Sequence, residues 1–228
     1  MVLAKTERIL RFRALFRLFL AGALLLTAAG FSVLPRVQAQ SPRASHLKTF
    51  TSPDGVFRLA YPNGFVLSQG GQSKSYLPVC QENGLACVVY PPARYKGTNF
   101  GAAALSVNEV KDATTETACF TFEAQQTVVD SNGQRNQTQE VSDKHPTETI
   151  NGTEFKTGVT GDAAMSHALA TDIYRTFHAG KCYEMDINIM QTSLGVYDPG
   201  TVRKFTQRDN RRVRNDLKKV LSSFTFLK

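Results

Sequence analysis

The stretch KCYEMDINIMQ, from Lys181 to Gln191, alternates apolar and polar side chains more cleanly than any other part of the chain. Successive side chains of a β-strand point to opposite faces, so this pattern predicts a strand with one apolar and one polar face. The apolar face is Tyr183, Met185, Ile187 and Ile189, and the polar face is Glu184, Asp186 and Asn188. Such a half-buried strand is typical of an antiparallel sheet.

The segment before this strand extends the sheet. Residues His167–Phe177 read as the preceding strand, and Ala179-Gly180 predicts the turn of a hairpin. A two-residue loop would pair Arg175 with Glu184 directly. A three-residue loop would shift this pairing by one position, and the sequence leaves both open.

The remaining elements are shorter strands and two helices. Strands are predicted at 47–51, 56–61, 64–67, 87–90, 102–110, 154–163 and 224–227. The helices are Thr114–Gln126, with Thr114 as its N-cap, and Thr201–Leu221. The second helix carries an apolar stripe made of Val202, Phe205, Val213, Leu217, Val220 and Leu221. These elements predict an α/β chain (an α+β sandwich), a largely antiparallel sheet flanked by two main helices.

Two segments carry a resemblance to a known family. GVFRLAYPNGFVL (Gly55–Leu67) resembles the opening strand-Tyr-Pro-turn-strand of the PsbP/Mog1-like superfamily, and LSSFTF (Leu221–Phe226) resembles its end. The resemblance implies an antiparallel sheet with helices packed against both faces, over roughly residues 47–228. The cysteines and a polar stretch near 130–146 point to an exported bacterial branch. The superfamily includes photosystem accessory subunits, nuclear-transport regulators and bacterial envelope proteins, so it implies no particular activity and no binding residues.

The first 39 residues predict export. Four arginines (Arg8, Arg11, Arg13 and Arg17) precede an uncharged run from Leu18 to Leu34, and Val37-Gln38-Ala39 forms a signal-peptidase site before Gln40. We therefore expect a periplasmic or extracellular protein. An uncleaved N-terminal membrane anchor is the alternative, and it would also leave the globular part exported. A cytosolic amphipathic segment is the third reading. No cysteine lies near the cleavage site, which excludes a lipoprotein anchor.

Removal of this segment changes the charge of the chain. Residues 1–39 hold six of the 27 basic residues and one of the 19 acidic residues, so residues 40–228 carry a net charge of +3. A general nucleic-acid role therefore loses its support. We expect residues 40–46 to be an exposed leader and 47–228 to be a single domain. The polar stretch 130–146 reads as a surface loop within that domain.

The four cysteines indicate disulfides in an oxidising compartment. Four cysteines allow three pairings. Cys80 and Cys87 flank an Asn83-Gly84 turn signal, which favours a local bridge, and Cys119 and Cys182 then pair by elimination. A zinc site and a redox pair are the alternatives. The spacing between Cys80 and Cys87 fits neither of them.

No catalytic motif is recognisable, and the sequence predicts no catalytic residue, cofactor or metal ligand. The four histidines are scattered over leader, loop, strand and turn, and they read as solvated side chains. Glu184 and Asp186 project to one face of their strand, where two carboxylates could hold a hard cation. The competing interpretation is an ordinary polar sheet face, balanced by Arg175 and Lys181.

The C-terminal helix is strongly basic. Eight cations oppose only Asp209 and Asp216, and this gives the helix a local charge of +6. The acidic partner could be anionic lipid headgroups, an acidic glycan or an acidic protein patch. The candidate contacts are Arg203, Arg208, Arg211, Arg212 and Lys219. The alternative is a helix whose outer face is merely charged. In the functional interpretation, the basic face contacts an acidic surface.

Two classes of function follow from these features. The first is a non-catalytic exported accessory module that binds a protein partner or an amphiphile in the cell envelope. The second is a cryptic hydrolase or metal-assisted envelope enzyme. The absence of a recognisable nucleophile–base pair favours the first.

Overall fold

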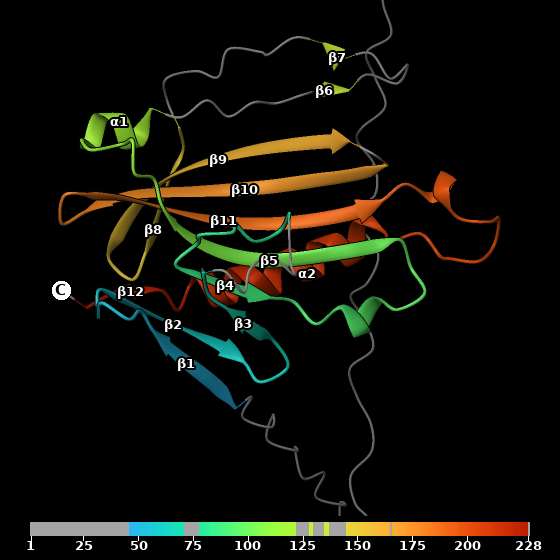
Figure 1. The fold of residues 1–228 in the computed structure, drawn as a ribbon, viewed down its shortest axis with the longest axis horizontal. Coiled ribbons are helices and arrows are strands. Elements are labelled where there is room, and N and C mark those ends of the chain that lie inside the picture. The colour runs from blue at the N-terminus through green and yellow to red at the C-terminus, as the bar shows by residue number, and fades with distance from the viewer. Residues whose placement is uncertain are drawn as a thin grey trace, which may run out of the picture. The chain divides into compact units, whose positions relative to one another are not determined.

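The computed structural model describes residues 46–70, 78–121, 128–129, 135–136, 145–164 and 166–227 (Figure 1). The expected signal segment 1–39 lies outside the described residues, as do nearly all of the leader and most of the polar stretch 130–146. Within the described ranges, no helix is long and apolar enough to cross a bilayer.

The main sheet has seven strands in the order β3-β4-β5-β11-β10-β9-β8, and every neighbouring pair is antiparallel. The predicted alternating strand, β11, lies at its centre (Figure 1). The strands are β3 (Val66–Ser68), β4 (Ala86–Val89), β5 (Phe100–Glu109), β8 (Thr147–Ile150), β9 (Thr153–Ala164), β10 (His167–His178) and β11 (Lys181–Thr192). Strand β8 was not predicted from the sequence.

A second sheet joins the first and last described strands. In it, β2 (Phe57–Pro62) lies between β1 (Leu47–Thr51) and β12 (Thr225–Phe226). A separate two-stranded pair, β6 (Val128–Val129) and β7 (Arg135–Asn136), places a short strand where the sequence predicted only loop.

The β10–β11 hairpin resolves the register that the sequence left open. His178 pairs with Lys181, so the loop has two residues and Arg175 lies opposite Glu184. Ala179 and Gly180 have φ angles of 49° and 80°. Both values are positive, as the favoured two-residue hairpin turn requires, and the glycine adopts its angle without strain.

Both predicted helices are present with different bounds. Helix α1 spans Glu116–Phe120, and residues 122–126 of the predicted helix lie outside the described residues. Its N-cap is Thr115 rather than Thr114, because the Thr115 side chain accepts a hydrogen bond from Ala118 N–H. Helix α2 spans Gln207–Leu221, so the predicted start at Thr201 is wrong. A capping box of Thr206 and Asp209 fixes the true start.

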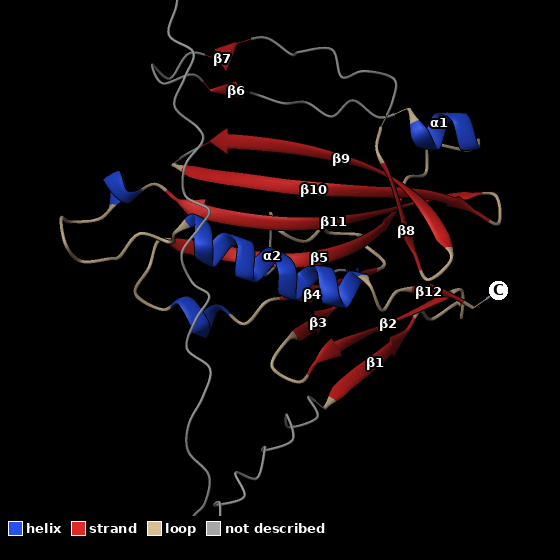
Figure 2. Cartoon of the chain, turned by 180° about the vertical axis from the view of Figure 1, so that it is seen from behind, coloured by secondary structure: helices blue, strands red, loops and turns tan. Residues whose placement is uncertain are grey.

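The helices cover opposite faces of the sheet. Helix α2 packs against β11 and β5 on the apolar face (Figure 2), where its side chains Val213, Leu217, Val220 and Leu221 are buried. Helix α1 is joined through a disulfide to Cys182, which alternates with Tyr183 and therefore faces the other side. The predicted fold class, a largely antiparallel sheet flanked by two helices, is confirmed.

The polar face of β11 was expected to face solvent, but in the structure it is buried. Asp186 and Asn188 are only 5% and 6% exposed. The Asn188 amide donates a hydrogen bond to the carbonyl of Val79, and Gly84 lies against the side chain of Asn108 on the neighbouring strand. The segment around the first disulfide therefore covers this face, which the alternation of a single strand could not reveal.

Candidate functional site

A group of exposed cations without ion-pair partners surrounds the start of α2. We call this group the basic surface, and it consists of Arg203, Lys204, Arg208, Arg211 and Arg212. None of these five side chains forms an ion pair with an acid in the described part of the chain. An ion pair would neutralise such a group locally, so these cations remain available to an external anion.

The other cations of α2 are committed within the domain. Arg214 pairs with Asp172 of β10. Lys218 lies 3.7 Å from Glu148 of β8, and Lys219 lies 3.0 Å from Asp216 within the helix. Four of the five predicted contact residues thus lie on the basic surface. Lys219 lies in the last turn of the helix with a partner, and Lys204 was missing from the prediction.

Asn99 holds the basic surface in place. Its Oδ1 accepts a hydrogen bond of 2.6 Å from the backbone N–H of Phe205, and its Nδ2 donates one of 2.6 Å to the carbonyl of Thr192. Arg203 also forms backbone hydrogen bonds with Gly97 and Asn99. The chain entering α2 is therefore extended and tied to the end of the sheet, which explains why the helix does not begin at Thr201.

Asp209 is the acid nearest to these cations in sequence, and it is engaged by the helix cap. Its carboxylate accepts hydrogen bonds from the hydroxyl and backbone N–H of Thr206. The hydroxyl bond has the larger effect in lowering the pKa of Asp209. A carboxylate in the first turn suits the positive end of the helix dipole. Its charge therefore has a structural role beside the basic surface.

Two hollows flank Gln191 at this end of β11. One of about 280 Å³ is lined by Gln191, Lys204, Phe205, Thr206, Gln207, Asn210 and Arg211. The other, of about 430 Å³, is lined by Asn99, Ala163, Ala164, Ser166, His167, Ala168, Gln191, Thr192 and Ser193. Two members of the basic surface, Lys204 and Arg211, thus border the first hollow.

A second candidate is the buried polar cluster beneath the other face of the sheet. Asp186 Oδ2 accepts hydrogen bonds from Asn108 Nδ2 at 3.2 Å and Ser106 Oγ at 3.4 Å. Asp186 Oδ1 and Asn108 Oδ1 have no hydrogen-bond partner among the described residues. Burial raises the pKa of Asp186 well above its usual value, and the negative charge of Glu184 raises it further, while Arg175 opposes the shift.

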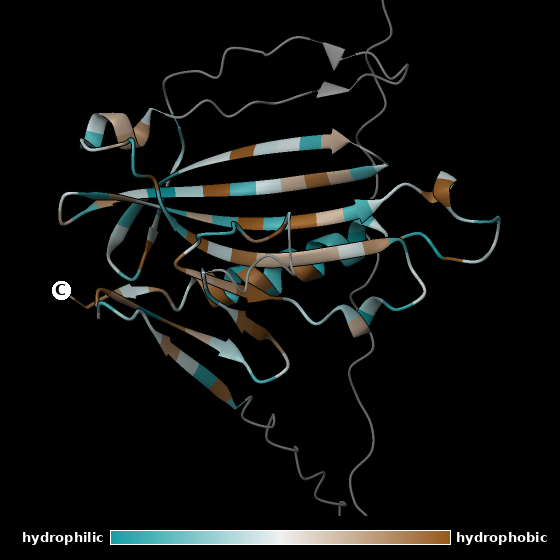
Figure 3. Cartoon of the chain, viewed as in Figure 1, coloured by the Kyte–Doolittle hydropathy of each residue, from teal (hydrophilic) through white to brown (hydrophobic). Residues whose placement is uncertain are grey.

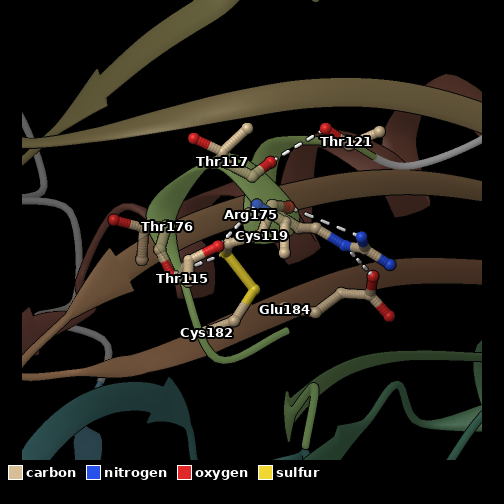
Figure 4. The surroundings of a disulfide bond; sticks show 9 residues. Thr115, Thr117, Cys119, Thr121, Arg175, Thr176, Cys182 and Glu184 are labelled. Atoms are coloured by element: carbon tan, nitrogen blue, oxygen red, sulfur yellow. Dashed lines mark hydrogen bonds and ion pairs between the residues drawn. A yellow bond between two sulfur atoms is a disulfide. The ribbon is translucent and has the colours of Figure 1, made fainter. Parts of the chain in front are cut away.

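The acids of the hairpin do not form one site. Arg175 Nε lies 2.5 Å from Glu184 Oε2 (Figure 4), whereas Asp172 points to the opposite face and pairs with Arg214. Among the described residues, no group of three or more His, Cys, Asp or Glu side chains could hold a metal ion. Of the histidines, His178 is not simply solvated as predicted, because it stacks on Phe226 with ring centroids 3.8 Å apart.

The cysteines form the two favoured disulfides. Cys80–Cys87 has a Cα–Cα distance of 5.9 Å, and Cys119–Cys182 has one of 5.4 Å. The second joins α1 to β11 beside the Arg175–Glu184 pair (Figure 4). No free cysteine remains.

Comparison with known proteins found similarity to several solved structures. No family model matches the sequence. No curated protein matches it. A cyanobacterial PsbP from Synechocystis is similar over 80% of this chain and 93% of its own, with 13% identity and a TM-score of 0.38. LpqN, which is involved in cell envelope biogenesis of Mycobacterium tuberculosis, is similar over 79% of this chain and 91% of its own, with 9% identity and a TM-score of 0.39.

A Bacteroides thetaiotaomicron protein is also similar, with 11% identity and a TM-score of 0.40. The match covers 79% of this chain but only 48% of that protein, about half its length. The likeness concerns the fold and assigns no activity to this chain.

Asp186 gives a testable dependence of stability on pH. Its folded-state pKa is raised, so its contribution to stability is complete below the unfolded pKa and is lost as the pH rises through the folded value. We expect Asp186→Asn to raise the free energy of unfolding at about pH 8 by about 2 kcal/mol, the usual cost of a poorly satisfied buried polar group. At about pH 3 the gain should nearly vanish, since an unfolded aspartate, with a pKa of about 3.9, is then largely protonated.

Urea unfolding at both pH values measures this effect. The exposed Asp112 provides the matched control, because Asp112→Asn removes the same charge from solvent. That control should change stability by less than about 0.5 kcal/mol at either pH. A variant Asp186→Asn that is less stable than the unchanged protein at about pH 8 would contradict the argument.

Proposed function

We propose that this chain is an exported, non-catalytic binding module that recognises an acidic partner through the basic surface. The observation that carries the proposal is that the cations of α2, and of the extended segment just before it, fall into two sets. Arg214, Lys218 and Lys219 pair with acids of the domain, whereas the five members of the basic surface are exposed and form no ion pair with a described acid. The second set thus has no described internal role.

The geometry supports binding through charge. Arg208, Arg211 and Arg212 lie within a turn and a half of one helix, and Asn99 fixes Arg203 and Lys204 at its start. Cations held on rigid elements create a local positive potential that attracts and orients an acidic partner. Since the net charge of residues 40–228 is only +3, the clustering matters more than the total charge.

Two features support export. The domain holds two disulfides, and disulfides form and persist in oxidising compartments. The basic and apolar pattern of residues 1–39 is that of a signal segment. The proposal therefore places the acidic partner outside the cytoplasm.

Charge reversal tests the basic surface. The variant Arg208→Glu/Arg211→Glu/Arg212→Glu should elute from a heparin column at clearly lower salt than the unchanged protein, because a polyanion bound through charge is released by screening. Its thermal unfolding should be nearly unchanged, because exposed charges contribute little to stability.

The matched control carries the same change in net charge elsewhere. Lys48, Arg58 and Lys111 are exposed and lie outside α2, so their reversal to glutamate isolates the effect of position. This control should elute close to the unchanged protein. Equal losses in the two triple variants would show that only net charge matters, and the proposal would fail.

A further inference from the structure

Two exposed aliphatic side chains share a single turn that precedes the basic surface in the chain. The six exposed large hydrophobic residues of the described chain are Leu47, Val66, Val159, Leu194, Val196 and Leu227. Only Leu194 and Val196 belong to the same element, the 3₁₀ helix η3 (Leu194–Val196), and they are 39% and 53% exposed. Figure 3 shows this turn as a hydrophobic tip beyond the end of the sheet.

Hydrogen bonds hold this turn at a defined place. The hydroxyl of Ser193 accepts a hydrogen bond from Gly195 N–H, and Ser193 N–H donates to the carbonyl of Ser166. The preceding residue, Thr192, is bound to both the backbone and the side chain of Asn99. Asn99 is also the residue that fixes the entry to α2, so the aliphatic turn and the basic surface are anchored to one side chain.

We propose that the acidic partner is an anionic lipid surface, with the basic surface on the headgroups and Leu194 and Val196 in the interfacial layer. This inference rests on the proposed function and names its partner. Stable attachment to a membrane surface generally needs two signals, and an apolar insertion beside a cluster of cations supplies both. A soluble polyanion would use the cations and would leave the aliphatic pair in water.

The charges around the turn agree with a lipid partner. From Ser193 to Arg212 the acids are Asp198 and Asp209, against the five cations of the basic surface, which gives a local charge of +3. Asp209 is engaged by the helix cap, so Asp198 is the acid that opposes the contact. Tyr197, which follows η3 and is half-buried, has the amphipathic character of side chains found at membrane interfaces.

The experiment compares vesicle binding with heparin binding for the exported form of the chain. The vesicles are an equimolar mixture of phosphatidylglycerol and phosphatidylcholine, with phosphatidylcholine alone as the neutral control. The variant Leu194→Ser/Val196→Ser should lose about tenfold or more in affinity for the anionic vesicles, because two aliphatic side chains no longer leave water. Its elution from heparin should not change.

A second pair of exposed valines provides the matched control. Val66 and Val159 are 46% and 48% exposed, and they belong to β3 and β9 rather than to η3. The variant Val66→Ser/Val159→Ser should bind vesicles like the unchanged protein. Charge reversal at Arg208, Arg211 and Arg212 should weaken binding to both vesicles and heparin.

The outcomes separate the two proposals. If the Leu194/Val196 variant binds anionic vesicles as tightly as the unchanged protein, the lipid inference is overturned, while heparin binding still supports the proposed function. Binding to heparin without any binding to vesicles would also overturn the inference and favour an acidic polymer or protein. If charge reversal affects neither probe, the proposed function itself fails.

Discussion

Leu217→Asp is expected to unfold most of the protein at room temperature. Leu217 is fully buried on α2, against the apolar face of the main sheet. The substitution removes the aliphatic contacts and places a carboxylate among apolar neighbours. Losing a buried leucine costs about 2–5 kcal/mol, and an unpaired buried charge adds to this. A total near 5 kcal/mol or more approaches the entire stability of a typical domain.

The same helix provides the control for this change. Asn215 lies two residues before Leu217 on α2 and is exposed. Asn215→Asp therefore introduces a carboxylate at nearly the same position along the helix, but in contact with solvent. We expect it to change the free energy of unfolding by less than about 0.5 kcal/mol. Urea unfolding followed by circular dichroism measures both variants. A folded Leu217→Asp variant with nearly unchanged stability would show that α2 does not close the core.

Removing the Cys119–Cys182 disulfide is expected to destabilise the domain by about 4 kcal/mol, the chain-entropy value for a loop of this length. The two cysteines are separated by 63 positions, and their bond ties α1 to the central strand. Both cysteines are to be replaced by alanine, so that no free thiol remains. The measurement is the free energy of unfolding without reductant.

The other disulfide is the matched comparison. Cys80 and Cys87 are separated by 7 positions, and the same model gives about 2.5 kcal/mol for so short a loop. The Cys80→Ala/Cys87→Ala variant should therefore be the more stable of the two double variants. The reverse order would show that local packing around Val79 and Cys80, rather than loop length, decides the contribution of each bond.

Periodicity predicted the centre of the fold well. Alternation placed Met185 and Ile187 in the core, and helical spacing placed Val213 and Leu217 against them, because each pattern reports directly on one buried face. The start of α2 was misplaced because Phe205 fits the helical stripe while belonging to an extended segment. Its hydrogen bond to Asn99 spans 106 positions, and no local pattern contains such a contact.

The candidate sites depended more on tertiary contacts. The basic character of α2 was visible in the sequence, but which cations remain unpaired follows from the acids brought close by β8 and β10. The sequence predicted a polar sheet face around Asp186. The structure buries it, because the segment around the Cys80–Cys87 disulfide, which is distant in the chain, covers it. Ser106 and Asn108 alternate on β5 as Asp186 and Asn188 do on β11, and this matching pattern was the available signal.

The small sheet sets the order in which the domain can assemble. Its middle strand, β2, is made early in the chain, yet one edge waits for β12, and Ala60 N–H waits for the hydroxyl of Ser223, 163 positions later. The ribosome delivers a chain from its N-terminal end, so the small sheet stays incomplete during synthesis until α2 and β12 have been made. A chain that stops before Ser223 would leave β2 with one unpaired edge and Ala60 N–H without this acceptor.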